Sequence, residues 1–160
     1  MISKQTALVL ILASTTLGGA SGCCKALGKK AAEKAAEKAA EKAMEENTDG
    51  GKAKVQIGSG ANLVGLSPTF HYPGAKPLMK MRNEVQGRNS TIYSMKTSEP
   101  MSKVTAFFDA ISSPKRISKT STDKNAIYVF GNNPTRSSYM VTLSPIANGE
   151  VGITVTQTNK

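Results

Sequence analysis

With 160 residues, 39% of them hydrophobic, the chain has room for one ordinary domain and some appended segments, and two full domains are not expected. Two cysteines, one histidine and no tryptophan leave almost nothing from which to build a His/Cys metal centre or a disulfide framework. The formal net charge is +10, and residues 50–160 hold most of it, with 14 Lys and Arg against five Asp and Glu. Such a region attracts anionic surfaces.

The first residues have the pattern of an export signal. One cation, Lys4, precedes an apolar run over residues 7–13, and small residues follow up to Cys23. The run is shorter than the roughly 20 apolar residues that cross a bilayer. We therefore interpret residues 1–22 as a secretory signal peptide.

The residues Ala20-Ser21-Gly22-Cys23 resemble the lipobox of bacterial lipoproteins. The resemblance implies a diacylglyceryl thioether on Cys23, cleavage before it and an acyl group, such as palmitate, on the new amino terminus. Several acyl chains anchor a protein stably, at about 0.8 kcal/mol per buried methylene. The alternatives are a tight Cys23–Cys24 pair in an ordinary signal peptide and two buried thiols near a helix that is retained in the mature chain. The lipid interpretation implies the bacterial cell envelope, and the outer membrane if the cell is Gram-negative, because Cys23 is not followed by Asp.

Residues 23–49 are expected to join the lipid to the domain. From Lys30 to Glu41 the chain repeats Lys-Ala-Ala-Glu, and all three residue types favour helix. A period of four does not keep an apolar stripe on one face of a helix with 3.6 residues per turn. The prediction is therefore a solvated Ala/Glu/Lys-rich spacer helix that ends at Gly50-Gly51. An alanine coiled coil and a peptidoglycan-facing helix are the alternatives.

Residues 50–160 predict one small domain. Met101, Val104 and Phe108 recur at helical spacing, with Thr97 or Ser98 as the expected N-cap. Short stretches with period-two alternation predict strands between turns rich in Gly, Pro and Asn. The predicted fold class is α+β, with one main helix packed on an antiparallel sheet. The predicted strands cover residues 54–57, 78–85, 90–97, 116–120, 125–130, 137–144 and 150–157.

Two short motifs in this domain resemble a known group. The stretch Tyr72-Pro73-Gly74-Ala75-Lys76 precedes a predicted hairpin, and the helix carries Val104-Thr105-Ala106-Phe107-Phe108. Over roughly residues 68–157, this order is similar to that of uncharacterised bacterial lipoprotein domains that open on Tyr-Pro-Gly-Ala-Lys. Those domains often have Gly-Trp after the helix, and this chain contains no Trp. The resemblance implies no established activity and no site residues.

The sequence nominates no catalytic residue, metal ligand or cofactor site. The stretch Gly58-Ser59-Gly60-Ala61-Asn62-Leu63 lacks the third glycine of a dinucleotide fingerprint and is predicted to be a loop. His71 is the one imidazole and is flanked by Phe70 and Tyr72, which favours packing. The acids of the domain are scattered, so a non-enzymatic protein is expected. They are Glu84, Glu99, Asp109, Asp123 and Glu150.

Two groups of cations are the candidate binding residues. Lys76 precedes the first long predicted strand, and Lys80 and Arg82 share one face of it. A second group follows the helix. If the groups adjoin, they form a site for phosphates or carboxylates. A solvated basic face is the alternative. The second group consists of Lys115, Arg116 and Lys119.

The predicted function is that of a lipid-anchored envelope protein that acts by binding or as a structural module. Its expected partners are the membrane through the acyl chains, an anionic envelope polymer or lipid headgroup, or a protein; nucleic acid is not expected. The alternative is an envelope hydrolase or an inhibitor of a cell-wall enzyme. The loop Gly58-Ser59-Gly60-Ala61 is similar to one in lipoprotein inhibitors of lysozyme, although a basic domain repels a basic lysozyme.

Overall fold

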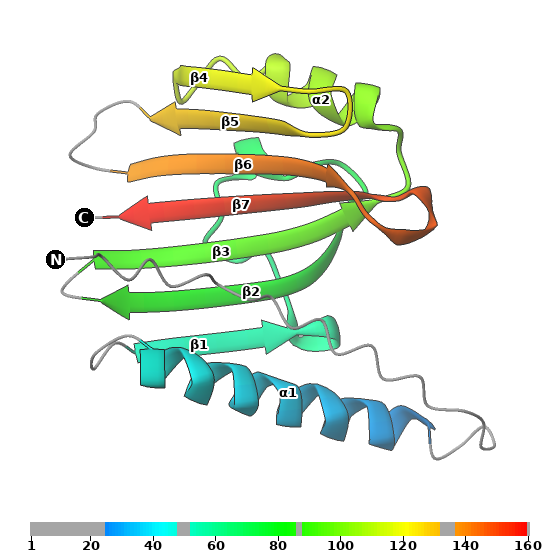
Figure 1. The fold of residues 1–160 in the computed structure, drawn as a ribbon, viewed down its shortest axis with the longest axis vertical. Coiled ribbons are helices and arrows are strands. Elements are labelled where there is room, and N and C mark those ends of the chain that lie inside the picture. The colour runs from blue at the N-terminus through cyan, green and yellow to red at the C-terminus, as the bar shows by residue number, and fades with distance from the viewer. Residues whose placement is uncertain (1–24, 48–51, 86–87, 132–136, 160) are drawn as a thin grey trace, which may run out of the picture.

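The computed structural model describes residues 25–47, 52–85, 88–131 and 137–159. These residues form two α-helices and a seven-stranded antiparallel sheet (Figure 1). The predicted α+β class is therefore confirmed. The predicted signal peptide, Cys23, Cys24 and Gly50-Gly51 lie outside the described residues.

The sheet is wholly antiparallel, and its order differs from the chain order. The strands lie side by side as β1-β2-β3-β7-β6-β5-β4, so that the last strand pairs with β3 in the middle of the sheet. All seven predicted strands are confirmed, with small shifts at their ends. Their bounds are β1 (Lys52–Ile57), β2 (Lys76–Val85), β3 (Arg88–Thr97), β4 (Arg116–Ser121), β5 (Ala126–Gly131), β6 (Ser137–Pro145) and β7 (Val151–Asn159).

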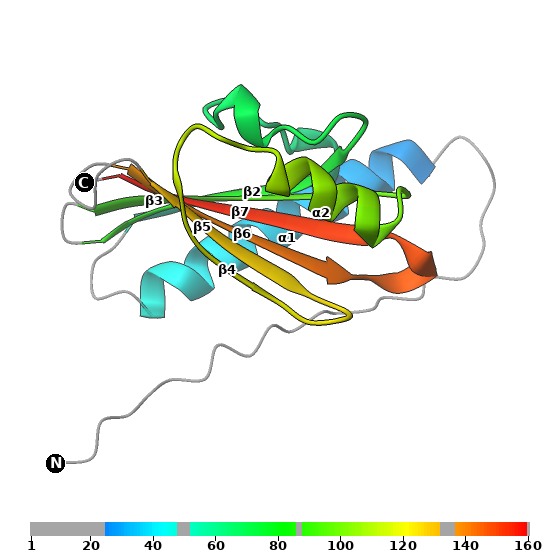
Figure 2. The same cartoon turned by 90° about the horizontal axis from the view of Figure 1, so that it is seen from above.

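One face of the sheet carries the hydrophobic core. Val151, Ile153 and Val155 of β7 are buried in alternation with residues of intermediate exposure, because successive side chains of a strand project to opposite faces. The helix α2 (Met101–Asp109) and the segment that holds the short 3-10 helix η2 (Pro68–Phe70) lie on the same side of the sheet (Figure 2). This side is the core face.

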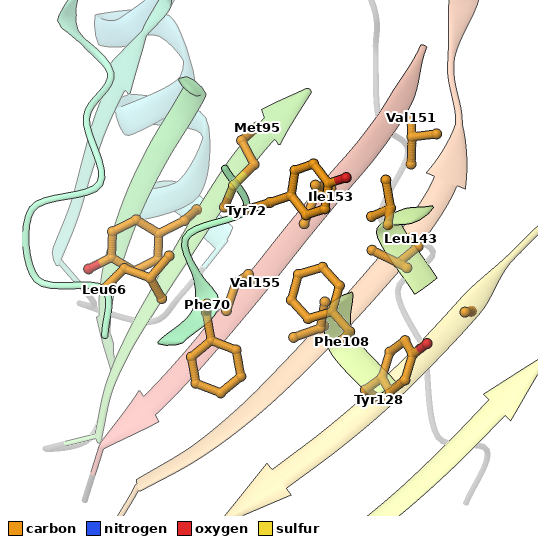
Figure 3. Close-up of a cluster of buried hydrophobic side chains, with 14 of the residues drawn as sticks. Leu66, Phe70, Tyr72, Met95, Phe108, Tyr128, Leu143, Val151, Ile153 and Val155 are labelled. Atoms are coloured by element: carbon orange, nitrogen blue, oxygen red, sulfur yellow. The ribbon is translucent and has the colours of Figure 1, made fainter. Parts of the chain in front are cut away.

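Aromatic side chains fill the space between α2, η2 and the sheet (Figure 3). The ring of Phe108 from α2 lies 5.9 Å from that of Tyr128 on β5. The ring of Phe70 from η2 lies 5.3 Å from Phe130 and 4.5 Å from Tyr139. All but Tyr139 of these five residues are fully buried. Elements far apart in the sequence are thus held together by edge-to-face and stacked rings.

The helix α2 begins one turn later than the predicted cap. Its N-cap position is Pro100, whose ψ of 149° is extended, and no side chain caps the helix. The predicted N-cap at Thr97 or Ser98 is therefore wrong. Thr97 instead accepts a hydrogen bond on Oγ1 from the backbone N–H of Glu99, at 3.2 Å. The fixed backbone of Pro100 suits the entry to a helix and needs no donor of its own.

The Ala/Glu/Lys-rich segment forms the helix α1 (Lys25–Asn47), which lies along β1 at one edge of the sheet (Figure 1). Glu41 Oε1 accepts a hydrogen bond from the backbone N–H of Val55 at 2.8 Å. Glu37 Oε1 accepts one from Ile57 at 2.7 Å. The structure therefore does not show the solvated spacer that the sequence predicted, because the glutamates of the repeat bind the strand.

The first glutamate of the repeat, Glu33, contacts the loop after β1. Glu33 Oε2 accepts a hydrogen bond from Ser59 Oγ at 2.8 Å, in the short 3-10 helix η1 (Gly58–Gly60). Gly58 has a φ of +61°, and a Cβ at this position would overlap the Glu33 carboxylate. The glycine loop is thus a contact surface for α1. Of the helices in the described ranges, neither is long and apolar enough to span a bilayer.

Candidate anion-binding site

A groove with three cations lies between β1 and β2. In the antiparallel register, Lys54 stands opposite Arg82 and Gln56 stands opposite Lys80. These four side chains line a shallow cavity of about 190 Å³. Since Lys80 is the register partner of Tyr93, the groove opens on the core face, beside the hydrophobic cover.

The loop between η1 and η2 fixes one of these cations. Lys80 donates a hydrogen bond from Nζ to the backbone oxygen of Val64 at 2.6 Å. Tyr93 donates its hydroxyl to the same oxygen at 3.3 Å, and the Lys80 ammonium lies 5.6 Å from the centre of the Tyr93 ring. Gly65 follows with a φ of +93°, a conformation that glycine adopts readily. Lys80 is thus held in place and keeps donors for a ligand.

The charges of the groove repel one another. Lys54 and Arg82 are direct cross-strand neighbours, and like charges in this arrangement destabilise a sheet. No described acid forms an ion pair with either residue, and Glu84, two residues after Arg82, stands opposite Lys52. Burial raises the pKa of Tyr93, and the nearby Arg82 charge acts against that increase. Within the described part of the chain, the charges of Lys54 and Arg82 are therefore not held in an ion pair.

The structure divides the first predicted cation group. Lys80 and Arg82 line the groove, but Lys76 does not. Lys76 stands opposite Lys96, whose ammonium group lies 2.8 Å from Glu150. Lys96 follows the buried core residue Met95 in β3, so Lys96 and its register partner Lys76 project to the face opposite the groove.

The second predicted cation group lies at the opposite edge of the sheet, with Lys115 just before β4 and Arg116 and Lys119 within it. Strands β2 and β4 are five strand positions apart, which is about 24 Å at a spacing of about 4.8 Å. Arg116 and Lys119 both pair with Asp109, at 2.8 and 2.7 Å. The Asp109 hydrogen bond raises the pKa of Lys119. Lys115, Arg116 and Lys119 therefore do not adjoin the first group, and the condition for one combined site is not met.

Sequence reasoning missed Lys54 and Gln56 as site residues. The alternation Lys52-Ala53-Lys54-Val55-Gln56-Ile57 does place these two residues on one face of a strand. However, eighteen residues, 58–75, separate β1 from β2, and no short hairpin turn links the strands. The pairing that brings Lys54 to Arg82 therefore had no local signal.

The acids of the domain serve mainly as partners of cations. Glu99 pairs with Lys103 at 2.9 Å, and Glu150 and Asp109 have the pairs given above. His71 Nε2 lies 3.1 Å from the backbone oxygen of Leu66, within the loop. Among the described residues, no group of three or more His, Cys, Asp or Glu could hold a metal ion.

No protein-family model, curated protein or solved structure matches this chain. The chemistry of the groove is therefore the basis for inferring a function. Its guanidinium and ammonium groups donate hydrogen bonds and carry positive charge. The guanidinium of Arg82 can bind a phosphate or carboxylate through two parallel hydrogen bonds. The arrangement suits binding of an anionic group.

Proposed function

We propose that this protein is a lipid-anchored component of the bacterial envelope that binds phosphate or carboxylate groups in the groove between β1 and β2, without catalysing a reaction. The observation that carries this proposal is the direct cross-strand pairing of Lys54 with Arg82. Two neighbouring cations weaken a sheet. A bound anion would attract both cations and so offset the repulsion between them. Such an arrangement is expected of a binding site rather than of a solvated surface.

The lipobox residues support the anchor. Because α1 begins at Lys25, an acyl group on Cys23 would be attached two residues before the helix. The hydrogen bonds of Glu33 and Glu37 orient the helix so that its first turn lies beyond the η1 end of β1. We infer that α1 carries the domain beside the membrane through these contacts, with the outer membrane as the destination in a Gram-negative cell.

Labelling with a fatty acid tests the anchor. Wild-type protein should incorporate the label and fractionate with membranes, and Cys23→Ser should do neither. Cys24→Ser is the matched control and should behave as wild type. Unlabelled wild-type protein, or a mature chain that retains residues 1–22, contradicts the proposal.

A charge reversal tests the groove. Lys54→Glu replaces repulsion with attraction across the strands, so we expect the free energy of unfolding to rise by up to about 1 kcal/mol. The same change should abolish binding of polyphosphate, measured by calorimetry. Lys124→Glu, in the turn between β4 and β5, is the control for net charge. The groove is not the binding site if the variants at positions 54 and 124 bind polyphosphate equally well.

A further inference from the structure

The Lys-Ala-Ala-Glu repeat adds a row of cations to α1. Glu37, which binds β1, has Lys34 three residues before it and Lys38 one residue after it. At 3.6 residues per turn, these lysines lie about 60–100° around the helix from Glu37. The repeat continues this arrangement, so the lysines form one row along the helix. Lys30, Lys34 and Lys38 of this row are exposed.

The direction of α1 decides on which side of the sheet edge the row lies. The helix runs antiparallel to β1: Glu37 binds Ile57, and the later Glu41 binds the earlier Val55. In a right-handed helix with this direction, the lysines turn toward the side to which Lys54 projects, and the alanine directly before each glutamate turns toward the side of Val55. Val55 is only 3% exposed, as expected for a side chain beside the alanines. The lysine row therefore adjoins the groove.

The cations of the helix and of the groove have similar spacing. Lys34 and Lys38 are four helical residues apart, which is about 6 Å along the axis. Lys80 and Arg82 are two strand residues apart, which is about 6.8 Å. Two neighbouring rows of this kind suit a chain that carries an anion in each repeating unit. A single phosphate or carboxylate would reach the groove but not the helix.

We propose that α1 and the groove form one surface for a linear polyanion, a polymer with phosphate or carboxylate groups along its length. This inference rests on the proposed function of the groove and specifies the class of its ligand. A bilayer fits the surface less well, because the Lys80 ammonium is turned back onto the Val64 oxygen and Lys80 as a residue is only partly exposed. A narrow chain can enter the groove, whereas a flat layer of headgroups meets only the exposed cations.

The test compares ligands of different length on the full acylated chain in nonionic detergent. The probes are long-chain polyphosphate, pyrophosphate and vesicles that contain phosphatidylglycerol. Lys34→Gln/Lys38→Gln should weaken binding of long-chain polyphosphate and leave binding of pyrophosphate unchanged. The slope of log K against log salt should fall by about 1.4, or about 0.7 for each lysine, as for a flexible single-stranded polyanion. Lys103→Gln/Lys124→Gln removes the same charge elsewhere and should leave the slope unchanged.

Three results would overturn the inference. If the helix variant and the control behave alike while Lys54→Glu abolishes binding, the groove binds anions without α1, and only the proposed function stands. If no variant affects binding, the proposed function fails as well. If the helix variant lowers binding to the vesicles as much as to polyphosphate, and chain length has no effect, the surface recognises a membrane and not a polymer.

Discussion

The Glu37 carboxylate binds the backbone N–H of Ile57 at 2.7 Å, on the outer side of an edge strand. Unpaired backbone groups at the edge of a sheet are a template for pairing with another chain. Glu41 makes the same contact with Val55, so two outward N–H groups of β1 have partners. The like-charge glutamate row, which is unfavourable in an isolated helix, thus gains a structural role once the helix meets the sheet.

Removal of both carboxylates should expose the edge of β1. We expect Glu37→Ala/Glu41→Ala to lower the free energy of unfolding by about 1–2 kcal/mol, since hydrogen bonds to charged groups are stronger than neutral ones but these are only partly buried. Amide hydrogen exchange at Val55 and Ile57 should become about tenfold faster, which corresponds to about 1.4 kcal/mol.

The exposed Glu45, on the same helix, provides the control. Glu45→Ala removes the same charge and should leave exchange at Val55 and Ile57 unchanged. Equal protection of these amides in the double variant and in wild type would mean that α1 does not cover β1 in solution.

The contact between η1 and α1 can be tested through Gly58. Its φ of +61° disfavours any L-residue, and an added Cβ would overlap the Glu33 carboxylate. Gly74 has a similar φ of +74°, but an added Cβ meets nothing within 4 Å. Gly74→Ala should cost about 1–2 kcal/mol of stability from backbone strain alone, and Gly58→Ala should cost more.

A double-mutant cycle separates the clash from the strain. In a Glu33→Ala background, the cost of Gly58→Ala should fall to that of Gly74→Ala, as measured by urea unfolding. If the cost of Gly58→Ala is the same with and without Glu33, the two elements are not in contact.

Local patterns were sufficient to predict the strands and α2, but not the order in which the strands pair. The alternation of β7 and the helical spacing of Val104 and Phe108 each report which side chains are buried, because burial follows the period of the element. The start of α2 was misplaced, since Thr97 and Pro100 both suit the entry to a helix. Only the path of the backbone decides between them.

The position of α1 had no such signal. Its repeat has no large apolar stripe, and the side chains that bind β1 are the charged Glu37 and Glu41. A pattern search for hydrophobic periodicity therefore predicts a solvated helix. The groove was missed for a related reason: Lys54 and Arg82 meet through a long-range strand pairing, which no local spacing encodes.

Two adjacent phenylalanines on α2 test how the core is packed. Phe108 is fully buried, so Phe108→Ala should lower the free energy of unfolding by about 3–5 kcal/mol. Phe107 is only partly buried at the margin of the core, and Phe107→Ala should cost clearly less. Both can be measured by urea unfolding. Equal costs would contradict the placement of α2 on the sheet.

Alkaline pH should destabilise the fold. Burial raises the pKa values of Tyr93 and Tyr128, and the Asp109 charge raises that of Tyr128 further. The unfolded chain loses these phenolic protons near pH 10, before the folded chain does. The stabilising contribution is therefore complete below about pH 10 and is lost as the pH rises through the higher folded values.

Replacement of one tyrosine isolates its share of this pH dependence. Tyr128→Phe removes a hydroxyl that donates to the Thr105 oxygen at 3.3 Å, so it should be somewhat less stable at neutral pH. Above about pH 10, however, its free energy of unfolding should fall less steeply than that of wild type. Urea unfolding across this range, together with ultraviolet titration of tyrosinate, gives both quantities. Parallel pH profiles for the two proteins would show that Tyr128 ionises equally easily in the folded and unfolded chains, which its burial beside Asp109 should prevent.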